Sequence, residues 1–422
     1  MLDSLNQRAD YLTRDEALGI LRVKPQTLYC YVSRGYIRSV PQPDGRSSFY
    51  AREDVEKMKA KSAARAGHGA AAAGAMRWGE PVIQTAITEI TPQGPRYRSR
   101  LALDLVRANV PFETVAEFLW TGQWFDELEC WRAPAPPVQI ASLFAASAKL
   151  NDDVHVQHLM ALIVEWLGVA EGPRIERVQM GGTPVQSARR VIRAMTGAFG
   201  HLSTRRGFLP LVDDESIARG LARALEADAS IAPHLNAALI LLADHELNPA
   251  TFAARIAASG GADVHASIGS ALDVHYGALV GRGCDRVEQL FAGSAEPAAV
   301  VSRVKAMHDA ARKLPGFNHP LYPDGDPRGR FLIALAREHA LDKKLVRNMS
   351  DALLRIEDEF EAHPTCETGL VFLCRALGLP DRTAGGMYAL GRSAGWVAHV
   401  LEQRLAGFVI RPRAKFVGVA AT

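Results

Sequence analysis

The chain has 422 residues, 48% hydrophobic and 23% charged, which is long enough for two or three domains and typical of globular proteins. Its apolar runs are too short for a membrane span, and no secretory signal is expected at the N-terminus. Five cysteines without a CxxC pair argue against a disulfide framework or zinc ribbon and favour the reduced cytoplasm. The formal net charge of +3 says little by itself, but basic residues cluster near the N-terminus.

The first predicted elements are two short helices followed by a small β wing. Thr13 is a good N-cap, and Glu16 three residues later completes a capping box that opens the first helix. Pro25 is typical of the first position of a second helix, which we expect to run to Ser33. Two helices joined by three or four residues form a helix-turn-helix pattern, and the Asp-Gly turn in PDGRSSFY (43–50) predicts the wing.

This N-terminal segment is rich in positive charge. From Arg22 to Arg52 it contains six basic residues against one acidic residue, Asp44. With its TLYCYVSRG string (27–35), the segment resembles winged DNA-binding domains of the MerR and excisionase type. Residues of the types that contact bases and phosphates in such helices are Lys24, Gln26, Thr27, Arg34, Arg38 and Arg46. The alternative is a small helical docking module with a solvated basic face.

The rest of the chain predicts a mainly α protein. The nearly pure Ala/Gly run at 63–75 is expected to be a linker, and from about Trp78 apolar residues follow a helical spacing. Asp213 or Asp214 is expected to cap a helix that begins at Ser216. Further helices are expected after an Asn-Pro start at 248–249, from 263 to 279 and from 388 to 404, with a strand pair within 81–97.

Histidines and arginines recur in four strings rich in turns and helix starts. Arginine pairs with carboxylates through two parallel hydrogen bonds, and histidine can hydrogen-bond a carbonyl, so this set suits a polycarboxylate ligand. The strings are LLADHELNPATFAAR (241–255), LPGFNHPLYPDGDPR (314–328), ALGRSAGWVAHVLEQ (389–403) and VIRPRAKFVG (409–418). Each histidine or arginine taken alone is more often a satisfied structural or solvated residue.

Together the strings closely resemble the bacterial citrate and 2-methylcitrate synthases, in the order and spacing of that family. The resemblance covers roughly residues 79–418 and implies a dimer of two-lobed helical subunits that close over their substrates. The implied organisation is a winged helix-turn-helix (1–62), a linker (63–78), a large helical lobe (79–281 plus 377–422) and a small helical lobe (282–376).

The resemblance also assigns the substrate-binding residues. The oxaloacetate-binding histidine falls on His245, and the histidine that polarises the oxaloacetate carbonyl falls on His319. The arginines that bind the substrate carboxylates fall on Arg328, Arg392 and, from the other subunit of the dimer, Arg411. No metal or resident cofactor is implied, with acetyl-CoA or another acyl-CoA as cosubstrate. His155 and His158 are accordingly expected on a solvated helix face rather than at a metal.

The acyl-CoA side departs from the family pattern. Val280 occupies the position of the family's catalytic histidine, Glu367 that of its general-base aspartate, and GRGCD (281–285) replaces the string that seats the thioester. Valine offers no hydrogen-bond donor, and losing one oxyanion donor typically costs about 100- to 1,000-fold in rate. On a continuous helix His275 would project about 140° away from Val280, so it is not expected to substitute. Cys284 is expected to be structural.

Three functions remain open on these observations. The first is condensation of oxaloacetate with acetyl-CoA or propionyl-CoA to citrate or methylcitrate, at a reduced rate. The second is a pseudoenzyme that binds oxaloacetate or citrate and regulates through a DNA-binding head. The third is a degenerate subunit that pairs with an active paralogue and completes that partner's site.

Overall fold

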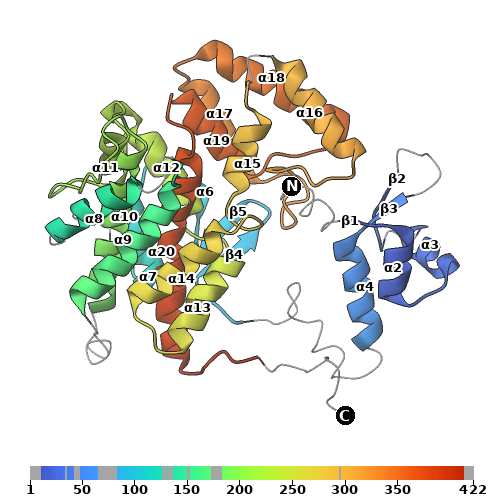
Figure 1. Cartoon of the computed structure of the whole chain (residues 1–422), viewed down its shortest axis with the longest axis horizontal. Helices are drawn as coiled ribbons and strands as arrows, with labels where there is room; N and C mark the ends of the chain where they lie inside the picture. The colour runs from blue at the N-terminus through green and yellow to red at the C-terminus, as the bar shows by residue number, and fades with distance from the viewer. Residues whose placement is uncertain are drawn as a thin grey trace. The chain divides into compact units, whose positions relative to one another are not determined.

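The chain is mainly helical (Figure 1), as its sequence predicted. By internal contacts it divides into two compact units, one made of Met1–Gln84, Ala298–Leu314 and Pro412–Thr422, the other of Thr85–Pro297 and Pro315–Arg411. The computed structural model describes residues 11–33, 36–41, 48–64, 83–125, 131, 136–149, 153–172, 183–293 and 296–412.

The first unit combines helices with a three-stranded antiparallel sheet of order β1-β3-β2. The expected capping box is confirmed, because the Thr13 side chain accepts from the Glu16 backbone and the Glu16 side chain reaches back to Thr13. The second helix begins at Pro25, as predicted. The elements of this unit are β1 (Tyr11–Leu12), α2 (Arg14–Leu21), α3 (Pro25–Ser33), β2 (Ser39–Pro41), β3 (Ser48–Ala51), α4 (Arg52–Ala64) and most of α16 (Pro297–Asp309).

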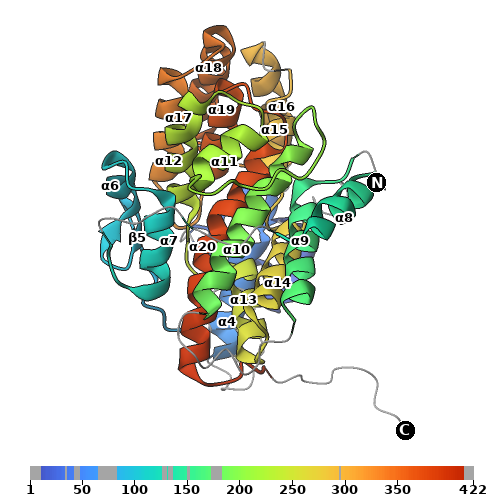
Figure 2. The same cartoon turned by 90° about the vertical axis from the view of Figure 1, so that its left-hand side faces the viewer.

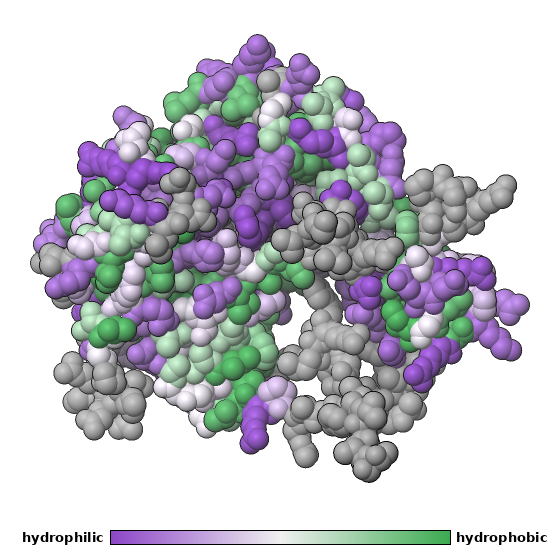
Figure 3. Space-filling model, viewed as in Figure 1, coloured by the Kyte–Doolittle hydropathy of each residue, from purple (hydrophilic) through white to green (hydrophobic). Residues whose placement is uncertain are grey.

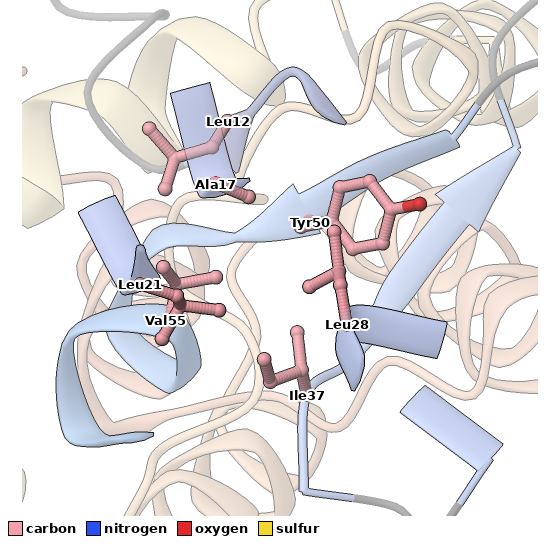
Figure 4. Close-up of a cluster of buried hydrophobic side chains, with 7 residues drawn as sticks. All are labelled: Leu12, Ala17, Leu21, Leu28, Ile37, Tyr50 and Val55. Atoms are coloured by element: carbon pink, nitrogen blue, oxygen red, sulfur yellow. The ribbon is translucent and has the colours of Figure 1, made fainter. Parts of the chain in front are cut away.

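A small apolar core holds α2, α3, α4 and the sheet together (Figure 4). Helix α2 supplies two buried side chains one turn apart, α3 and α4 supply one each, and β3 supplies Tyr50. The buried residues of this core are Leu12, Ala17, Leu21, Leu28, Ile37, Tyr50 and Val55. Helices α2, α3 and α4 are therefore fixed relative to the sheet by packing rather than by local propensity alone.

The predicted wing and linker are described only in part. Strands β2 and β3 pair antiparallel, with Val40 opposite Phe49, on either side of the predicted Asp-Gly turn. That turn lies within residues 42–47, outside the described residues, as does most of the expected linker.

The second unit contains a small antiparallel sheet, β4-β5-β6, which confirms the strand pair expected within residues 81–97. Helices make up the rest. Its elements are β4 (Thr88–Thr91), β5 (Gly94–Tyr97), β6 (Arg100–Leu101), α6 (Ala102–Arg107), α7 (Phe112–Thr121), α8 (Val138–Ala148), α9 (Val156–Glu171), α10 (Thr183–Gly197), η2 (Ala198–His201), α11 (Ile217–Ala224), η3 (Ala229–Ile231), α12 (Ala232–Leu242), α13 (Pro249–Ser259), α14 (Val264–Tyr276), α15 (Gly283–Leu290), α17 (Pro327–Glu338), α18 (Lys343–Phe360), α19 (Cys366–Ala376) and α20 (Thr383–Ala406).

Helix α20 is the central element of this unit (Figure 2). It packs against α7, α10, α12, α13 and α14, and nearly all of its residues from Thr383 to Val400 are buried. A helix buried on all sides can present polar side chains only to other protein groups or to a ligand. At the other end of the unit, α17 packs closely on α19, and α18 packs on both.

Three boundaries differ from the expectations, the first being that of α20, which runs from Thr383 to Ala406 and not from 388 to 404. Ser216, not Asp213 or Asp214, caps α11, because the helix begins at Ile217 and the Ser216 side chain accepts from the Arg219 backbone. Helix α14 ends at Tyr276, three residues before the expected end, because Gly277 has left the helical conformation. By contrast, Asn248 and Pro249 start α13 as predicted.

In the part of the chain that the structure describes, no helix has the length and apolarity needed to cross a membrane. The face of the molecule drawn in Figure 3 shows hydrophilic residues interspersed with smaller hydrophobic patches.

Candidate functional site

A buried ion pair at the start of α17 anchors the site. Asp326 caps this helix, and its carboxylate accepts hydrogen bonds from Arg328 Nε at 3.0 Å and Arg328 Nη2 at 2.8 Å. The same carboxylate accepts the backbone N–H of Cys366 at 3.0 Å, which ties the start of α19 to the start of α17. Burial disfavours the charged carboxylate, but the Arg328 guanidinium outweighs this and holds the pKa of Asp326 below its ordinary value.

A second buried arginine comes from α20. Arg392 is fully buried, and its Nη2 donates to the hydroxyl of Tyr388, one turn earlier, at 3.1 Å. Arg392 Nε and Nη1, together with Arg328 Nη1, have no hydrogen-bond acceptor among the described residues. Buried guanidinium groups are normally fully paired, so these three nitrogens indicate room for an anionic ligand with oxygen acceptors.

Two histidines complete the cluster. The rings of His245 and His319 lie 5.1 Å apart, and His245 Nε2 is 3.1 Å from the Tyr322 hydroxyl. Burial, and then the positive charge of both guanidinium groups, lowers the pKa of His245 well below its ordinary value, so it is neutral at physiological pH. His319 Nδ1 accepts the backbone N–H of Leu321 at 3.1 Å, so in the neutral ring the proton is on Nε2, where it can be donated.

The turn that carries His245 is held by a buried polar chain. Asp244 is fully buried, and its Oδ2 lies 3.4 Å from His399 Nε2 on α20. His399 Nδ1 in turn is 2.9 Å from Arg255 Nη1, which also donates to Glu402 at 2.6 Å. This chain connects α13, α20 and the 244–245 turn, so the position of His245 depends on α20, the helix that carries Arg392.

The residue at the position of the expected catalytic histidine lies in a turn after α14. The Val280 backbone N–H donates to Gly277 O at 3.0 Å, so the chain folds back over the last turn of the helix. A Cβ built on the next residue, Gly281, would lie 2.9 Å from His275 Cδ2. The expected angle of about 140° between His275 and Val280 assumed a helix that continues past Tyr276, and this assumption is wrong because α14 ends there.

Glu367 lies in the first turn of α19 beside this segment. Its Oε2 accepts from Thr365 Oγ1 at 2.5 Å, and a Cβ built on Gly283 would lie 3.2 Å from its Cγ. The carboxyl group thus faces the start of α15, which follows the Val280 turn. Cys284 is buried there, and burial, followed by the charge of Glu367, raises the pKa of its thiol, which fits the expected structural role.

The structure brings together most of the residues expected to bind substrate. His245, His319 and Arg328 all surround Tyr322. Arg392 is close enough for its positive charge to lower the pKa of His245. Arg411 does not join them within this chain: it is exposed in the segment after α20.

Residues expected to contact DNA are only partly described. Lys24 and Gln26 are exposed and Thr27 is half-buried, all at the start of α3. Arg38 is exposed, but it forms ion pairs with Asp54 at 2.8 Å and Glu53 at 3.4 Å, which offset its charge. Arg34 and Arg46 lie outside the described residues.

His155 and His158 were expected on a solvated helix face, and this expectation is confirmed for His158 only. His158 is exposed, but His155 is buried as the N-cap of α9, with Nε2 3.4 Å from Asp285 Oδ1. Among the described residues, no group of three or more His, Cys, Asp or Glu side chains is placed to hold a metal ion.

Four residues of the site were not identified from the sequence: Tyr322, Asp326, Tyr388 and Asp244. Each lies inside, or one residue before, a string that was singled out. Asp326 stands before a Pro-Arg pair, which is a helix-start signal. The other three carry no local signal, because their importance comes from contacts between distant elements.

Known proteins share this architecture. A family model described as citrate synthase, C-terminal domain, matches residues 75–413. A putative citrate synthase 2 of Mycobacterium tuberculosis is 29% identical over 343 residues, which cover 76% of this chain and 86% of that protein. A 2-methylcitrate synthase of the same species is 24% identical over 364 residues, covering 81% of this chain and 89% of that protein.

The fold also matches solved structures. One is a citrate synthase of the archaeon Thermoplasma acidophilum in ternary complex with carboxymethyl coenzyme A and oxaloacetate. It has a TM-score of 0.69 and 20% identity, and the match covers 81% of this chain and 95% of that one. The elements from β1 to α4 lie outside the residues that the family model matches.

We predict that Asp326→Asn destabilises the second unit. Removing one partner of a buried ion pair leaves Arg328 uncompensated, which costs about 3–5 kcal/mol. The pKa of Asp326 is lowered in the folded state, so its stabilisation is present at neutral pH and is lost as the pH falls through that pKa. Thermal unfolding from pH 7 to pH 3 should show a lower midpoint at pH 7 and a weaker acid dependence in the variant.

Asp324→Asn is the matched control, since Asp324 is exposed two residues earlier. Equal midpoints for Asp326→Asn and Asp324→Asn at pH 7 would show that the buried pair does not hold the site together.

Proposed function

Because the chain belongs to the citrate synthase family, we propose that it condenses oxaloacetate with acetyl-CoA or propionyl-CoA to citrate or 2-methylcitrate. The observation that supports this most directly is that three guanidinium nitrogens of Arg328 and Arg392, buried beside two histidines, have no partner among the described residues. Oxaloacetate offers two carboxylates for the arginines and a ketone oxygen for a histidine. The relatives named citrate and 2-methylcitrate synthase support the reaction class.

In this proposal each residue of the cluster has a separate task. Arg328 and Arg392 donate to the carboxylates of oxaloacetate, and charge-assisted bonds of this kind both bind and orient the substrate. His319 donates from Nε2 to the ketone oxygen, because its Nδ1 is already occupied by the backbone of Leu321. His245 stays neutral and, with the Tyr322 hydroxyl, adds a polar contact without a further positive charge.

Glu367 is the base that removes a proton from the acyl-CoA carbon next to the thioester. The Thr365 hydroxyl holds one of its oxygens and so fixes the direction of the other. Glutamate is one methylene longer than the family's aspartate, and a misplacement of about 1 Å can cost about 100-fold. Val280 removes a donor from the thioester oxygen, so we propose a turnover well below that of the family's usual members.

The proposal includes a dimer. Arg411 is exposed in the single chain, so it is free to reach the oxaloacetate site of a second copy. If the partner is a paralogous chain, Arg411 would complete the oxaloacetate site of that chain, and turnover would then require both chains.

We predict slow but measurable release of CoA thiol when oxaloacetate and acetyl-CoA or propionyl-CoA are mixed with the full chain. The rate should be about 1,000-fold or more below that of a family member with the usual histidine and aspartate, because of the donor and base changes. Glu367→Gln should abolish the release, since the amide cannot accept the proton.

Glu338→Gln, a change on the exposed face of α17, is the control and should leave the rate unchanged. Thiol release that is equal in Glu367→Gln and in the wild type would rule out Glu367 as the base. Complete absence of release with both acyl-CoAs would rule out the condensing activity of the chain alone.

We also propose that the first unit binds duplex DNA as a winged helix-turn-helix. The supporting observation is that α2 and α3 are joined by only three residues and pack on one core, with Lys24 and Gln26 exposed at the start of α3. Polar and basic side chains at the N-terminus of such a second helix are placed to contact bases and phosphates. In the regulatory form of this proposal, oxaloacetate bound to the second unit changes the DNA affinity of the first.

We predict that the full chain retards genomic fragments, including DNA from beside its own gene, in gel shifts at low salt. Affinity should fall steeply as salt rises, because each phosphate contact releases counterions. Lys24→Ala combined with Gln26→Ala should weaken binding more than Lys57→Ala, because Lys57 on α4 is already paired with Glu53. No retardation at the lowest salt would mean that the first unit is a docking module and not a DNA-binding domain.

A further inference from the structure

The condensing reaction needs a hydrogen-bond donor at the thioester oxygen, and Val280 does not supply one. When a base removes the adjacent proton, negative charge develops on that oxygen, and a donor positioned there stabilises it. If the chain has the proposed condensing function, this donor must lie near Glu367, because the donor and the base must reach the same thioester.

The Tyr388 hydroxyl has an unused proton. Its oxygen accepts a hydrogen bond from Arg392 Nη2 at 3.1 Å, so the phenol is a donor with one acceptor position occupied by a cation. No oxygen or nitrogen in the described part of the chain accepts the Tyr388 O–H. A hydrogen bond accepted from a charged group polarises the O–H and strengthens the bond that it can donate.

Packing contacts connect Tyr388 to the segment that Glu367 faces, because its ring stacks on His275 and a Cβ built on Gly281 would lie 2.9 Å from His275 Cδ2. Burial raises the pKa of Tyr388, and among the charges that act on it are Arg392, which lowers it, and Glu367, which raises it. The phenol therefore keeps its proton at physiological pH, and its oxygen is bonded to a substrate-binding arginine. This is the arrangement in which a neutral tyrosine can serve as an oxyanion donor.

The aromatic ring of Tyr388 packs against His275, which in turn packs against Trp396. The His275 ring stacks on it with centroids 5.4 Å apart and an interplanar angle of 19°, and it also contacts the Trp396 ring edge-on at 5.5 Å. Burial and the nearby Arg392 lower the pKa of His275 to about 3, so it is a neutral packing partner. Such packing limits the rotation of the phenol and holds its hydroxyl in a fixed position.

His275 is the rival donor, since its Nε2 is buried and has no partner among the described residues. The charged and titratable groups that act on His275 are Arg392 and His155, whereas Glu367 acts on Tyr388. The Tyr388 hydroxyl is bonded to a substrate-binding arginine, whereas His275 packs under Gly281 and beside Trp396. Substitution of each residue separates the two donors.

We propose that Tyr388 is a catalytic residue that donates a hydrogen bond to the thioester oxygen and so compensates in part for the histidine missing at position 280. Glu367 takes the proton from the carbon next to the thioester. The electron pair of that C–H bond forms the C=C bond of the enolate, and the carbonyl π electrons move to the oxygen. Tyr388 keeps its proton and stabilises the negative charge until the enolate carbon attacks the ketone carbon of oxaloacetate. The thioester C=O then re-forms, and the ketone oxygen takes the electron pair of its C=O bond and a proton from His319. Water hydrolyses the thioester of the product and so releases the CoA thiol.

The test is Tyr388→Phe in the full chain, with kcat from thiol release and oxaloacetate affinity from calorimetry. Loss of one oxyanion donor should lower kcat by about 100- to 1,000-fold, while oxaloacetate still binds. The second change Val280→His, added to Tyr388→Phe, should recover part of kcat by supplying the missing donor. Tyr276→Phe is the matched control, and removal of its hydroxyl should leave kcat unchanged.

Four results would overturn the proposal. Wild-type kcat in Tyr388→Phe would show that the phenol is not the donor, with the condensing function intact. Weaker oxaloacetate binding with unchanged kcat at saturation would show that Tyr388 only positions Arg392. A loss of kcat in His275→Asn but not in Tyr388→Phe would assign the donor to His275. No turnover by the wild type with either acyl-CoA would remove the condensing function, and the proposal with it.

Discussion

The bidentate ion pair between Asp326 and Arg328 is the interaction on which the site depends. It uses both carboxylate oxygens, fixes the arginine at the start of α17, and still accepts the backbone N–H at the start of α19. Because Glu367 follows in the first turn of α19, the same carboxylate that orients a substrate-binding arginine also positions the proposed base. Asp326 leaves guanidinium nitrogens of Arg328 and Arg392 without an acceptor among the described residues, and these fit a ligand with anionic oxygens.

The second constraint is how closely α20 approaches the turn that carries His245. A Cβ built on Gly395 would lie 2.6 Å from Ala243 O and 2.2 Å from Asp244 Oδ1, so only glycine fits there. A Cβ built on Gly391, one turn earlier, would lie 2.7 Å from Leu242 Cβ. The two glycines bring the turn within reach of His399, and thereby set the distance between His245 and Arg392.

Features that depend on a few consecutive residues could be predicted from the sequence. The capping box at Thr13, the start of α13 at Asn248 and the residues that surround Tyr322 could all be identified in this way. Prediction from the sequence failed where a boundary depends on tertiary structure: α14 stops at Tyr276 although the pattern of side chains continues, and the chain then folds back so that Gly281 lies against His275. Tyr388 was missed because a phenol on an apolar helix looks like core until its partner, Arg392, is seen.

The central claim is that a buried cationic cluster is built for a dicarboxylate. Calorimetric titration of the full chain with oxaloacetate at pH 7 tests this without requiring turnover. The account predicts saturable binding that is much weaker for a monocarboxylate such as pyruvate, is strongly reduced by Arg392→Ala, and is unaffected by Arg347→Ala on the exposed face of α18. No heat and no thermal shift at millimolar oxaloacetate, or equal binding of pyruvate, would contradict it.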